Sequence, residues 1–461
     1  MMQLIARQIG PRVFLAVVIL APLLFGSATV RSIAFLLALS ALALLLAPAP
    51  SSRRLAVLLA LSGSAFVMFA LFSSLQLTFA FGLVGFDPIA LVDEARSLLL
   101  PVPGGPAFSL DASLYPETMM RALLATLVFW NALLYGQDRN RALASLNTMV
   151  VATAIMSALT IALFVADPSR VLWREKVAYF RDFTGPFVHR GAAGAWLCLL
   201  GISAALLLVR ALDHLLTHFV VDDASLPKRL LLAFFAEPIR LTFLATVTVL
   251  TVAGLLLTQS RTAGLVFGFN ILGLVAILFM TRLGSTRATV AIAVTVLTGF
   301  ALMFAAAGSG LRDRLADTSF FEEGRWEIWG STLRAILDRP ILGFGAGTFR
   351  DLFPLFRSEA LASLGPIQKA HSLPLEIASE SGLPIAVLLC GLWLGISVYL
   401  LAGLLRATRF DALRSAGVLA AFSAIPFVSI DVIYDTFGYV APLLAIVGLA
   451  LAQPESRAPR S

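Results

Sequence analysis

Long apolar runs that are almost free of charge are the feature that most constrains how this chain can fold. Examples are residues 13–30, 241–257 and 383–405. A helix needs about 20 mainly apolar residues to cross the hydrocarbon core of a membrane. Strands of a membrane barrel are about ten residues long and alternate in polarity, whereas these runs are longer and do not alternate. The pattern therefore predicts an all-α polytopic membrane protein.

The composition excludes an ordinary soluble protein. Of the 461 residues, 59% are hydrophobic and 13% are charged, whereas a soluble domain carries roughly 25% charged residues. The runs predict about 12 transmembrane helices, to within one or two because some runs are short. They lie near residues 13–30, 32–47, 55–75, 119–136, 142–166, 191–211, 241–258, 262–281, 288–307, 383–405, 415–432 and 436–452.

Basic residues predict the orientation, because Lys and Arg are enriched in short cytoplasmic loops. With the amino terminus in the cytoplasm, every connection on that side is basic. The residues concerned are Arg53, Arg54, Arg139, Arg141, Lys228, Arg229, Arg240, Arg282, Arg287, Arg406, Arg409 and Arg414. The outer side then holds residues 76–118, 167–190, 259–261 and 308–372. Both termini are thus expected in the cytoplasm.

Two residues on the outer face are hard to explain as lipid-facing structure. Arg261 lies in a short polar turn between two apolar helices, and His371 lies where the long outer loop enters the membrane again. An arginine in such a turn either extends to the lipid headgroups or faces a cavity. A histidine at this place is either an interfacial residue or a functional one. Position alone leaves these alternatives open.

The outer loop 167–190 is basic, which topology disfavours. Its basic residues are Arg170, Arg174, Lys176, Arg181 and Arg190. Such a loop either anchors the protein at the membrane surface or binds an anion. Both interpretations remain open at this point.

Nothing in the sequence indicates a metal site or a cofactor. The outer face has no DxD or HExxH motif, which would be typical of a metal site. The glycine run 343–347 does not follow a strand of a βαβ unit, so a dinucleotide-binding interpretation fails, and a tight turn is the default. We therefore expect neither a metal ion nor a cofactor.

The order of these motifs resembles the O-antigen ligase and O-antigen polymerase superfamily of bacterial inner-membrane glycosyltransferases. Arg261-Thr-Ala-Gly-Leu265 fits the family's Arg-x3-Leu motif, and His371 with Gly382 fits its His-x10-Gly motif. Residues 338–349 are similar to the glycine segment that precedes this histidine, and residues 185–190 to the segment that opens the sixth span. The resemblance covers roughly residues 180–450. Ser372 and Gly191 stand where asparagine is common, which puts the acceptor specificity in doubt.

The resemblance implies a GT-C-like membrane fold with three parts. Residues 1–180 would form helices 1–5 and their outer loops. Residues 181–452 would form the ligase- or polymerase-like core, including a long, partly helical periplasmic loop, 308–372, between spans 9 and 10. Residues 453–461 would form a cytoplasmic tail. The expected location is the bacterial inner membrane, with the active site on the periplasmic face.

The family implies a donor glycan on undecaprenyl diphosphate and an acceptor hydroxyl. Arginines are suited to hold the diphosphate leaving group because their planar forks bind phosphate oxygens in pairs. A histidine can accept the acceptor's proton at neutral pH. The expected catalytic residues are His371 and Arg261. The expected substrate-binding residues are Arg190, His189, Arg181, Lys176, Arg174, Glu380 and Arg325.

Direct displacement without a metal would invert the anomeric centre of the transferred sugar. The favoured acceptor is lipid A-core, as for an O-antigen ligase. A polymerase of O-antigen or exopolysaccharide, whose acceptor is a second lipid-linked glycan, is the main alternative.

A protein oligosaccharyltransferase and a transporter or flippase are less favoured. Transporters place ionisable residues near the membrane midplane, where these spans have almost none. The other expected partners are membrane lipids. No nucleic acid is expected, and the oligomeric state is open.

Overall fold

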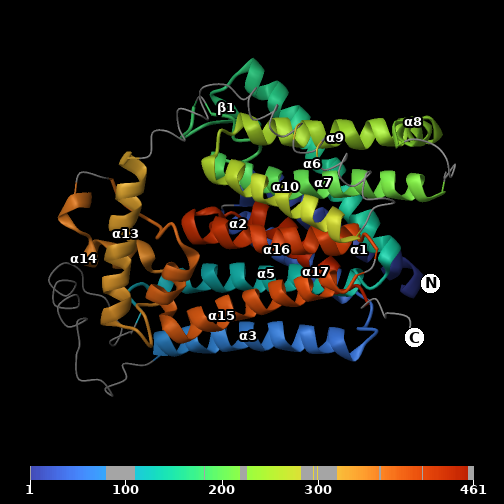
Figure 1. Ribbon diagram of the computed structural model, residues 1–461. Coiled ribbons are helices and arrows are strands. Elements are labelled where there is room, and N and C mark those ends of the chain that lie inside the picture. Colours follow the sequence, from blue (N-terminus) through green and yellow to red (C-terminus); the bar gives the residue numbers. More distant parts are fainter. Residues whose placement is uncertain are drawn as a thin grey trace.

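The computed structural model describes residues 2–27, 29–78, 109–180, 182–218, 226–281, 294, 298, 319–362, 365–407 and 409–454. Long helices run side by side through most of these residues (Figure 1). They are α1 (Met2–Leu23), α2 (Val30–Leu45), α3 (Arg53–Thr78), α5 (Tyr115–Tyr135), α6 (Arg139–Ala166), α7 (Arg190–His218), α9 (Pro238–Leu257), α10 (Arg261–Thr281), α15 (Leu373–Leu405), α16 (Ala412–Ile430) and α17 (Phe437–Leu451).

The predicted all-α polytopic architecture is confirmed. Within the described residues, 8 helices are long and apolar enough to cross a membrane, and the apolar parts of α1, α2 and α17 are shorter. Each predicted run coincides with one of these helices except the ninth, residues 288–307, nearly all of which lies outside the described residues. The total of about 12 therefore stays a prediction.

The first helix ends earlier than predicted. It stops at Leu23 and a short 3-10 turn, η1 (Phe25–Ser27), follows. Gly26 has a φ of 72°, a left-handed conformation that glycine adopts without steric cost. A Cβ at this position would lie 2.7 Å from Thr436 and 2.8 Å from Phe187. The apolar sequence continues past this point, but the backbone reverses.

Elements outside the bundle of long helices lie at its two ends. The remaining ones are η2 (Ala112–Leu114), β1 (Arg170–Val171), β2 (Arg174–Glu175), α8 (Leu226–Ala236), α13 (Ser319–Asp338), α14 (Phe349–Phe356), η3 (Glu359–Leu361) and η4 (Ile433–Asp435). The strands β1 and β2 pair antiparallel as a small hairpin. Figure 1 shows α13 and α14 beyond one end of the long helices and α8 at the other end. The long loop before α15 is thus partly helical, as predicted.

Local sequence signals explain where several helices begin. The Asp138 carboxylate accepts a hydrogen bond from the Arg141 N–H at 2.7 Å, and Asp411 caps α16 in the same way. Such caps satisfy backbone donors that have no partner inside the helix. Proline occupies the first turns of α9 and α15, where its missing N–H costs no hydrogen bond.

One hydrophobic core connects most of the bundle. It contains residues from Phe14 in α1 to Leu451 in α17 and the adjacent Ala452. Helix α7 lies at its centre, since 89% of its apolar window is buried, and α3 lies at the periphery with 11%. Residues on both sides of position 180 share this core. The division into parts at that position stays a prediction.

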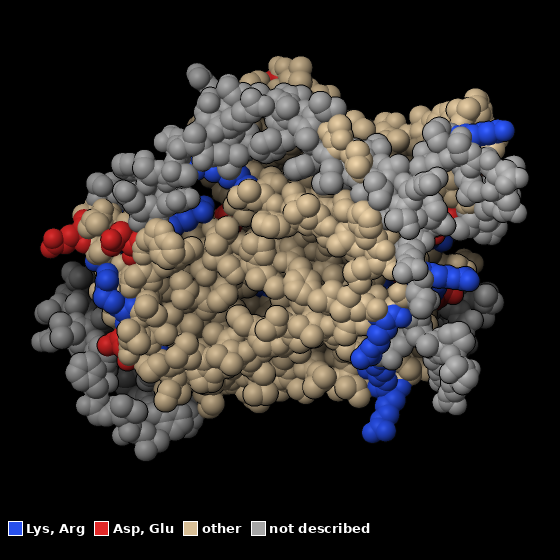
Figure 2. Space-filling view, viewed as in Figure 1, with Lys and Arg blue, Asp and Glu red and all other residues tan. Residues whose placement is uncertain are grey.

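Charged side chains gather at the two ends of the molecule. Figure 2 shows a broad uncharged band between them. At the end opposite α13, Arg54 donates to the carbonyl oxygens of Leu451 and Gln453 at 2.8 and 2.6 Å, and Arg139 pairs with Asp411 at 2.9 Å. These basic residues thus join the helix ends there. The uncharged band is what a membrane protein presents to lipid.

Candidate functional site

The turn before α15 brings His371 into a fixed position at the end of the bundle that carries α13. His371 itself has a φ of 54°, which is unusual for a residue with a side chain. The neighbouring Ala370 donates its N–H to Glu376 at 2.9 Å and accepts a hydrogen bond from the Trp329 indole at 3.1 Å. The turn is therefore held both by the first turn of α15 and by α13.

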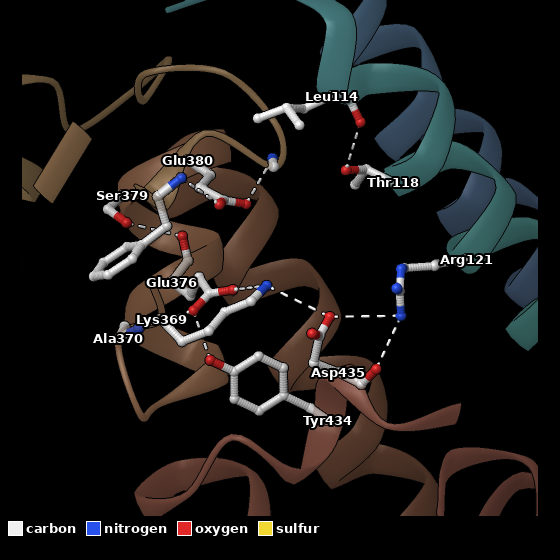
Figure 3. A network of polar contacts seen from close by, with 12 residues as sticks. Leu114, Thr118, Arg121, Lys369, Ala370, Glu376, Ser379, Glu380, Tyr434 and Asp435 are labelled. Carbon is white, nitrogen blue, oxygen red and sulfur yellow. Dashed lines mark hydrogen bonds and ion pairs between the residues drawn. The ribbon is translucent and has the colours of Figure 1, made fainter. Parts of the chain in front are cut away.

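The carboxylate of Glu376 is the centre of a buried polar network (Figure 3). Its side chain accepts the Tyr434 hydroxyl at 2.6 Å and the Lys369 ammonium at 3.2 Å, besides the Ala370 N–H. Burial alone would lower the pKa of Lys369, but Glu376 and Asp435 outweigh burial and raise it. Lys369 therefore stays charged and paired. Sequence reasoning missed Glu376, whose only signal was its position five residues after His371.

A glycine loop, defined as residues 340–348, packs against the start of α15. The N–H groups of Phe344 and Gly345 donate to the carbonyl oxygens of Ser379 and Glu380, at 3.0 and 2.8 Å. The carboxylate of Glu380 accepts the N–H groups of Gly347 and Phe349, both at 2.9 Å. The tight turn expected from the glycine run is confirmed, and Glu380 holds it. Its expected role in substrate binding stays a prediction.

Gly382 allows this close approach. Gly382 interrupts the helix, with a φ of 78° and a ψ of 162°. The residues just before it contact the glycine loop. A Cβ on Gly382 would lie 2.0 Å from the Ile341 carbonyl oxygen. The next N–H, of Leu383, donates to the Pro340 carbonyl oxygen at 2.7 Å. The His-x10-Gly motif thus needs glycine at this position because two backbone segments are in contact here.

Two histidines share one site with a buried carboxylate. His189 precedes α7, and its Nδ1 accepts the Gly191 N–H at 3.1 Å, so in the neutral ring the proton is on Nε2. A Cβ on Gly191 would lie 2.7 Å from His189 and 2.9 Å from Asp431 Oδ2. Asp431 also interacts electrostatically with His371. The structure therefore adds Asp431, at the end of α16, to the candidate residues.

The surroundings of His371 favour its neutral form. Burial lowers its pKa below the ordinary 6.5, and the positive charge of Arg325 and the nearby His189 lower it further, while Asp431 opposes them. Burial likewise lowers the pKa of His189. The His371 Nδ1 is buried and has no hydrogen-bond partner among the described residues. At neutral pH this nitrogen or its ring partner can accept a proton.

Two arginines on different helices lie close to this pair of histidines. Arg190, the first residue of α7, pairs with Asp182 at 2.8 Å and lies 5.4 Å from the Tyr179 ring. The Tyr179 ring in turn contacts His189 edge-on, with centroids 5.0 Å apart. Arg325 from α13 interacts electrostatically with both histidines, and its Nε is buried without a hydrogen-bond partner among the described residues.

Arg261 is the first residue of α10, at the same end of the bundle. Gln259 in the preceding turn has a φ of 49°. A Cβ on Gly194 in α7 would lie 2.7 Å from Ala263 and 3.1 Å from Ser260, so the turn packs on the first turns of α7. The structure thus places Arg261 and Arg190 at the starts of two helices that pack together.

The hairpin residues occupy different surroundings. The Arg174 guanidinium lies over the Phe25 ring at 4.5 Å. The Lys176 ammonium is buried and donates to the Asp182 carbonyl oxygen at 2.7 Å, and burial lowers its pKa. Arg181 lies outside the described residues. These contacts stabilise the hairpin, and the expected role of these residues in anion binding stays a prediction.

A cavity of about 650 Å³ lies beside the Glu376 network. Its walls come from α3, α5, α15, α17 and the glycine loop. Its polar end carries Glu117, Arg121, Arg350, Lys369, Glu376, Glu380 and Asp435. No group of three or more His, Cys, Asp or Glu residues in the described part of the chain is arranged to hold a metal ion.

Comparison with known proteins agrees with this geometry. Residues 246–390 match a family model described as O-antigen ligase. The matched segment runs from α9 into α15 and includes Arg261, Arg325, His371 and Gly382. No curated protein matches the chain. The match confirms, for these residues, the resemblance seen in the sequence, and the described helices are those of a polytopic membrane protein.

Proposed function

We propose that the protein is a glycosyltransferase that moves a glycan from undecaprenyl diphosphate to an acceptor hydroxyl on the periplasmic face of the bacterial inner membrane. The favoured acceptor is lipid A-core, so that the enzyme acts as an O-antigen ligase. One observation supports this reaction most directly. The buried Nδ1 of His371 has no hydrogen-bond partner among the described residues, and burial, together with the charges of Arg325 and His189, lowers the pKa of the ring.

His371 is the proposed general base. As the acceptor oxygen attacks the anomeric carbon, its proton passes to the histidine ring, and the bond between that carbon and the diphosphate oxygen breaks. A single displacement of this kind inverts the anomeric centre. A well-placed general base contributes about 10²–10⁴ in rate. Asp431, which raises the pKa of His371, would stabilise the imidazolium that forms.

The arginines are the proposed binding site of the diphosphate. Negative charge develops on the leaving group, and guanidinium groups stabilise it through paired, charge-assisted hydrogen bonds. At this end of the bundle, Arg190 and Arg261 are the first residues of α7 and α10, and Arg325 lies in α13. Arg174, Lys176 and Arg181 could assist from the neighbouring loop, and the reaction as proposed needs no metal ion.

The decisive experiment is transfer in a reconstituted membrane. The purified full-length protein is supplied with a lipid-linked oligosaccharide and with lipid A-core. His371→Ala and Arg261→Ala should each reduce transfer to background while the protein stays inserted. The controls are His214→Ala and Arg240→Ala, at the opposite end of the bundle. Transfer near the wild-type rate by either site variant would remove that residue from the mechanism.

The same assay distinguishes the alternative acceptor. A second lipid-linked glycan replaces lipid A-core, and the size and linkage of the product are determined. A ladder of products that grows by one repeat unit would identify a polymerase. A single addition to lipid A-core would support the ligase.

A further inference from the structure

The His371 turn, defined as residues 369–371, is held by side chains from two directions. Ala370, at its centre, is fully buried. Its N–H donates to the Glu376 carboxylate at 2.9 Å, and its carbonyl oxygen accepts the Trp329 indole N–H at 3.1 Å. The next residue, His371, has a φ of 54°, which a residue with a side chain keeps only where the surrounding structure enforces it. These two hydrogen bonds enforce the backbone next to the proposed general base.

The first contact comes from the connection between α16 and α17. The Tyr434 hydroxyl of this connection donates to the Glu376 carboxylate at 2.6 Å. The Lys369 ammonium adds a second link, because it lies 3.2 Å from Glu376 and 3.4 Å from Asp435. Figure 3 shows these groups converging. The connection is thus joined to the His371 turn at two points.

Asp431 stands at the start of the same connection and is buried. Its carboxylate accepts the Val432 N–H at 2.8 Å. The Asp435 N–H donates to the Val432 carbonyl oxygen at 3.2 Å, which closes the short turn η4. The segment from Asp431 to Asp435 is therefore one hydrogen-bonded unit, and the bond that fixes Tyr434 also fixes Asp431.

The second contact comes from α13, which carries Arg325. Trp329 follows Arg325 by four residues, so the two side chains lie on the same face of this helix. The Trp329 indole reaches the Ala370 carbonyl oxygen, so this face is directed toward the His371 turn. Arg325 accordingly acts electrostatically on His371.

The two contacts carry charges of opposite sign to the histidine. Arg325 and His189 lower the pKa of His371, whereas Asp431 raises it. These charges come from α13, from the segment before α7 and from the end of α16. An electrostatic interaction weakens with distance. A loosened contact on either side should therefore move the pKa of the ring, in a direction that depends on the side.

We propose that Tyr434 and Trp329 are positioning residues for the transfer reaction. Tyr434, through its bond to the first turn of α15, holds Asp431 at a fixed distance from the His371 ring. Trp329 does the same for Arg325. Neither positioning residue needs to touch a substrate. The assignment rests on the proposed function, in which His371 is the general base.

Two conservative substitutions test the two contacts separately. Tyr434→Phe and Trp329→Phe each remove one hydrogen-bond donor, keep an aromatic ring and change no charge. A change in the pKa of His371 therefore reports a change in distance. Loosening Asp431 in Tyr434→Phe should lower this pKa by about 0.3–0.5 pH units. Loosening Arg325 in Trp329→Phe should raise it by a similar amount.

The pKa is measured without turnover, from the exchange of the imidazole C2 hydrogen for deuterium at a series of pH values. The full-length protein is exchanged in detergent and analysed by mass spectrometry after digestion with trypsin, which places His189 and His371 in different peptides. Shifts of opposite sign in the two variants are the expected result. An unmoved pKa in both variants, or shifts of the same sign, would overturn the proposal.

Each variant has a matched control. Tyr439→Phe removes a buried hydroxyl that has no hydrogen-bond partner among the described residues. Trp326→Phe shortens an exposed side chain on α13 and keeps a ring against Trp329. Both controls should leave the pKa of His371 unchanged. A control that shifts it as much as its partner variant would assign the effect to ring packing and contradict the proposal.

Transfer kinetics connect the two contacts to the reaction. In both Tyr434→Phe and Trp329→Phe, kcat at neutral pH should fall about tenfold, while the KM values for donor and acceptor stay unchanged. The loss of kcat toward acid pH should begin at lower pH in Tyr434→Phe and at higher pH in Trp329→Phe. Wild-type kcat in both variants would contradict the positioning role.

The exchange measurement separates this proposal from the proposed function. If His371→Ala still transfers glycan, the proposed function fails, while the pKa shifts still show whether the two contacts position the ring. If His371→Ala is inactive but both phenylalanine variants keep the wild-type pKa and kcat, only the positioning role fails.

Discussion

Replacing Gly382 by alanine tests whether the break in α15 holds the glycine loop against this helix. At a φ of 78° and a ψ of 162°, an alanine costs about 1–3 kcal/mol in backbone strain. The added Cβ would lie 2.0 Å from the Ile341 carbonyl oxygen and 2.5 Å from its carbon. These are backbone atoms on a packed segment, so a small side-chain movement cannot relieve the overlap.

The backbone must therefore shift and lose the hydrogen bond from Leu383 to Pro340, which measures 2.7 Å. Such a bond contributes about 0.5–1.5 kcal/mol. Strain and the lost bond together destabilise the variant by about 1.5–4.5 kcal/mol, and the overlap adds to this amount. Because the glycine loop also contacts Glu380, the loss should open the loop rather than the whole bundle.

The assay combines thermal unfolding in detergent with limited tryptic digestion. Arg350 follows the glycine loop directly, so tryptic cleavage after Arg350 should become at least tenfold faster in Gly382→Ala. Gly391→Ala is the matched control, since nothing lies within 4 Å of its added Cβ on the same helix. Alanine there should be neutral or stabilise α15 by up to about 1 kcal/mol. Wild-type stability and cleavage in Gly382→Ala would refute the reasoning.

Two further predictions concern the chemistry. Burial and Arg325 lower the pKa of His371 below its ordinary 6.5. The loss of kcat that follows protonation of this base should therefore set in only below pH 6.5. Arg325→Gln removes a positive charge, so the pKa rises and this loss should set in at higher pH; an unmoved onset would contradict the assignment. Transfer should also survive EDTA, and complete loss that one metal ion restores would show that a metal takes part.

Membrane topology singled out two candidate residues at the outer face, and only the family resemblance assigned them a catalytic role. Arg261 and His371 interrupt apolar stretches at the outer face, and the structure confirms that both lie at helix starts at one end of the bundle. Asp431 could not be found in this way. It lies 60 residues after His371, and only the packing of α16 and α7 brings it to the histidines.

The basic loop 167–190 shows the limit of composition. Its positive charge left a membrane anchor and an anion site open, and in the structure the Lys176 ammonium donates to a backbone carbonyl and Arg174 covers an aromatic ring. Arg190, from the same loop, lies over the Tyr179 ring, and this ring contacts His189. Composition counts all these cations alike. Only the tertiary structure shows which residues surround each cation, and therefore whether its own loop already supplies a partner.

The sequence by itself determined that this chain lies in a membrane and where most of its helices run, because apolarity and helix breaks are properties of short segments. Tertiary structure alone decided which residues share a site. The cavity joins Phe66 of α3, Arg121 of α5 and Glu376 of α15. Glycine is required at position 382 because of its backbone conformation and because Ile341 and Leu342 pass within contact distance. Such contacts depend on how helices pack against one another, which no local pattern encodes.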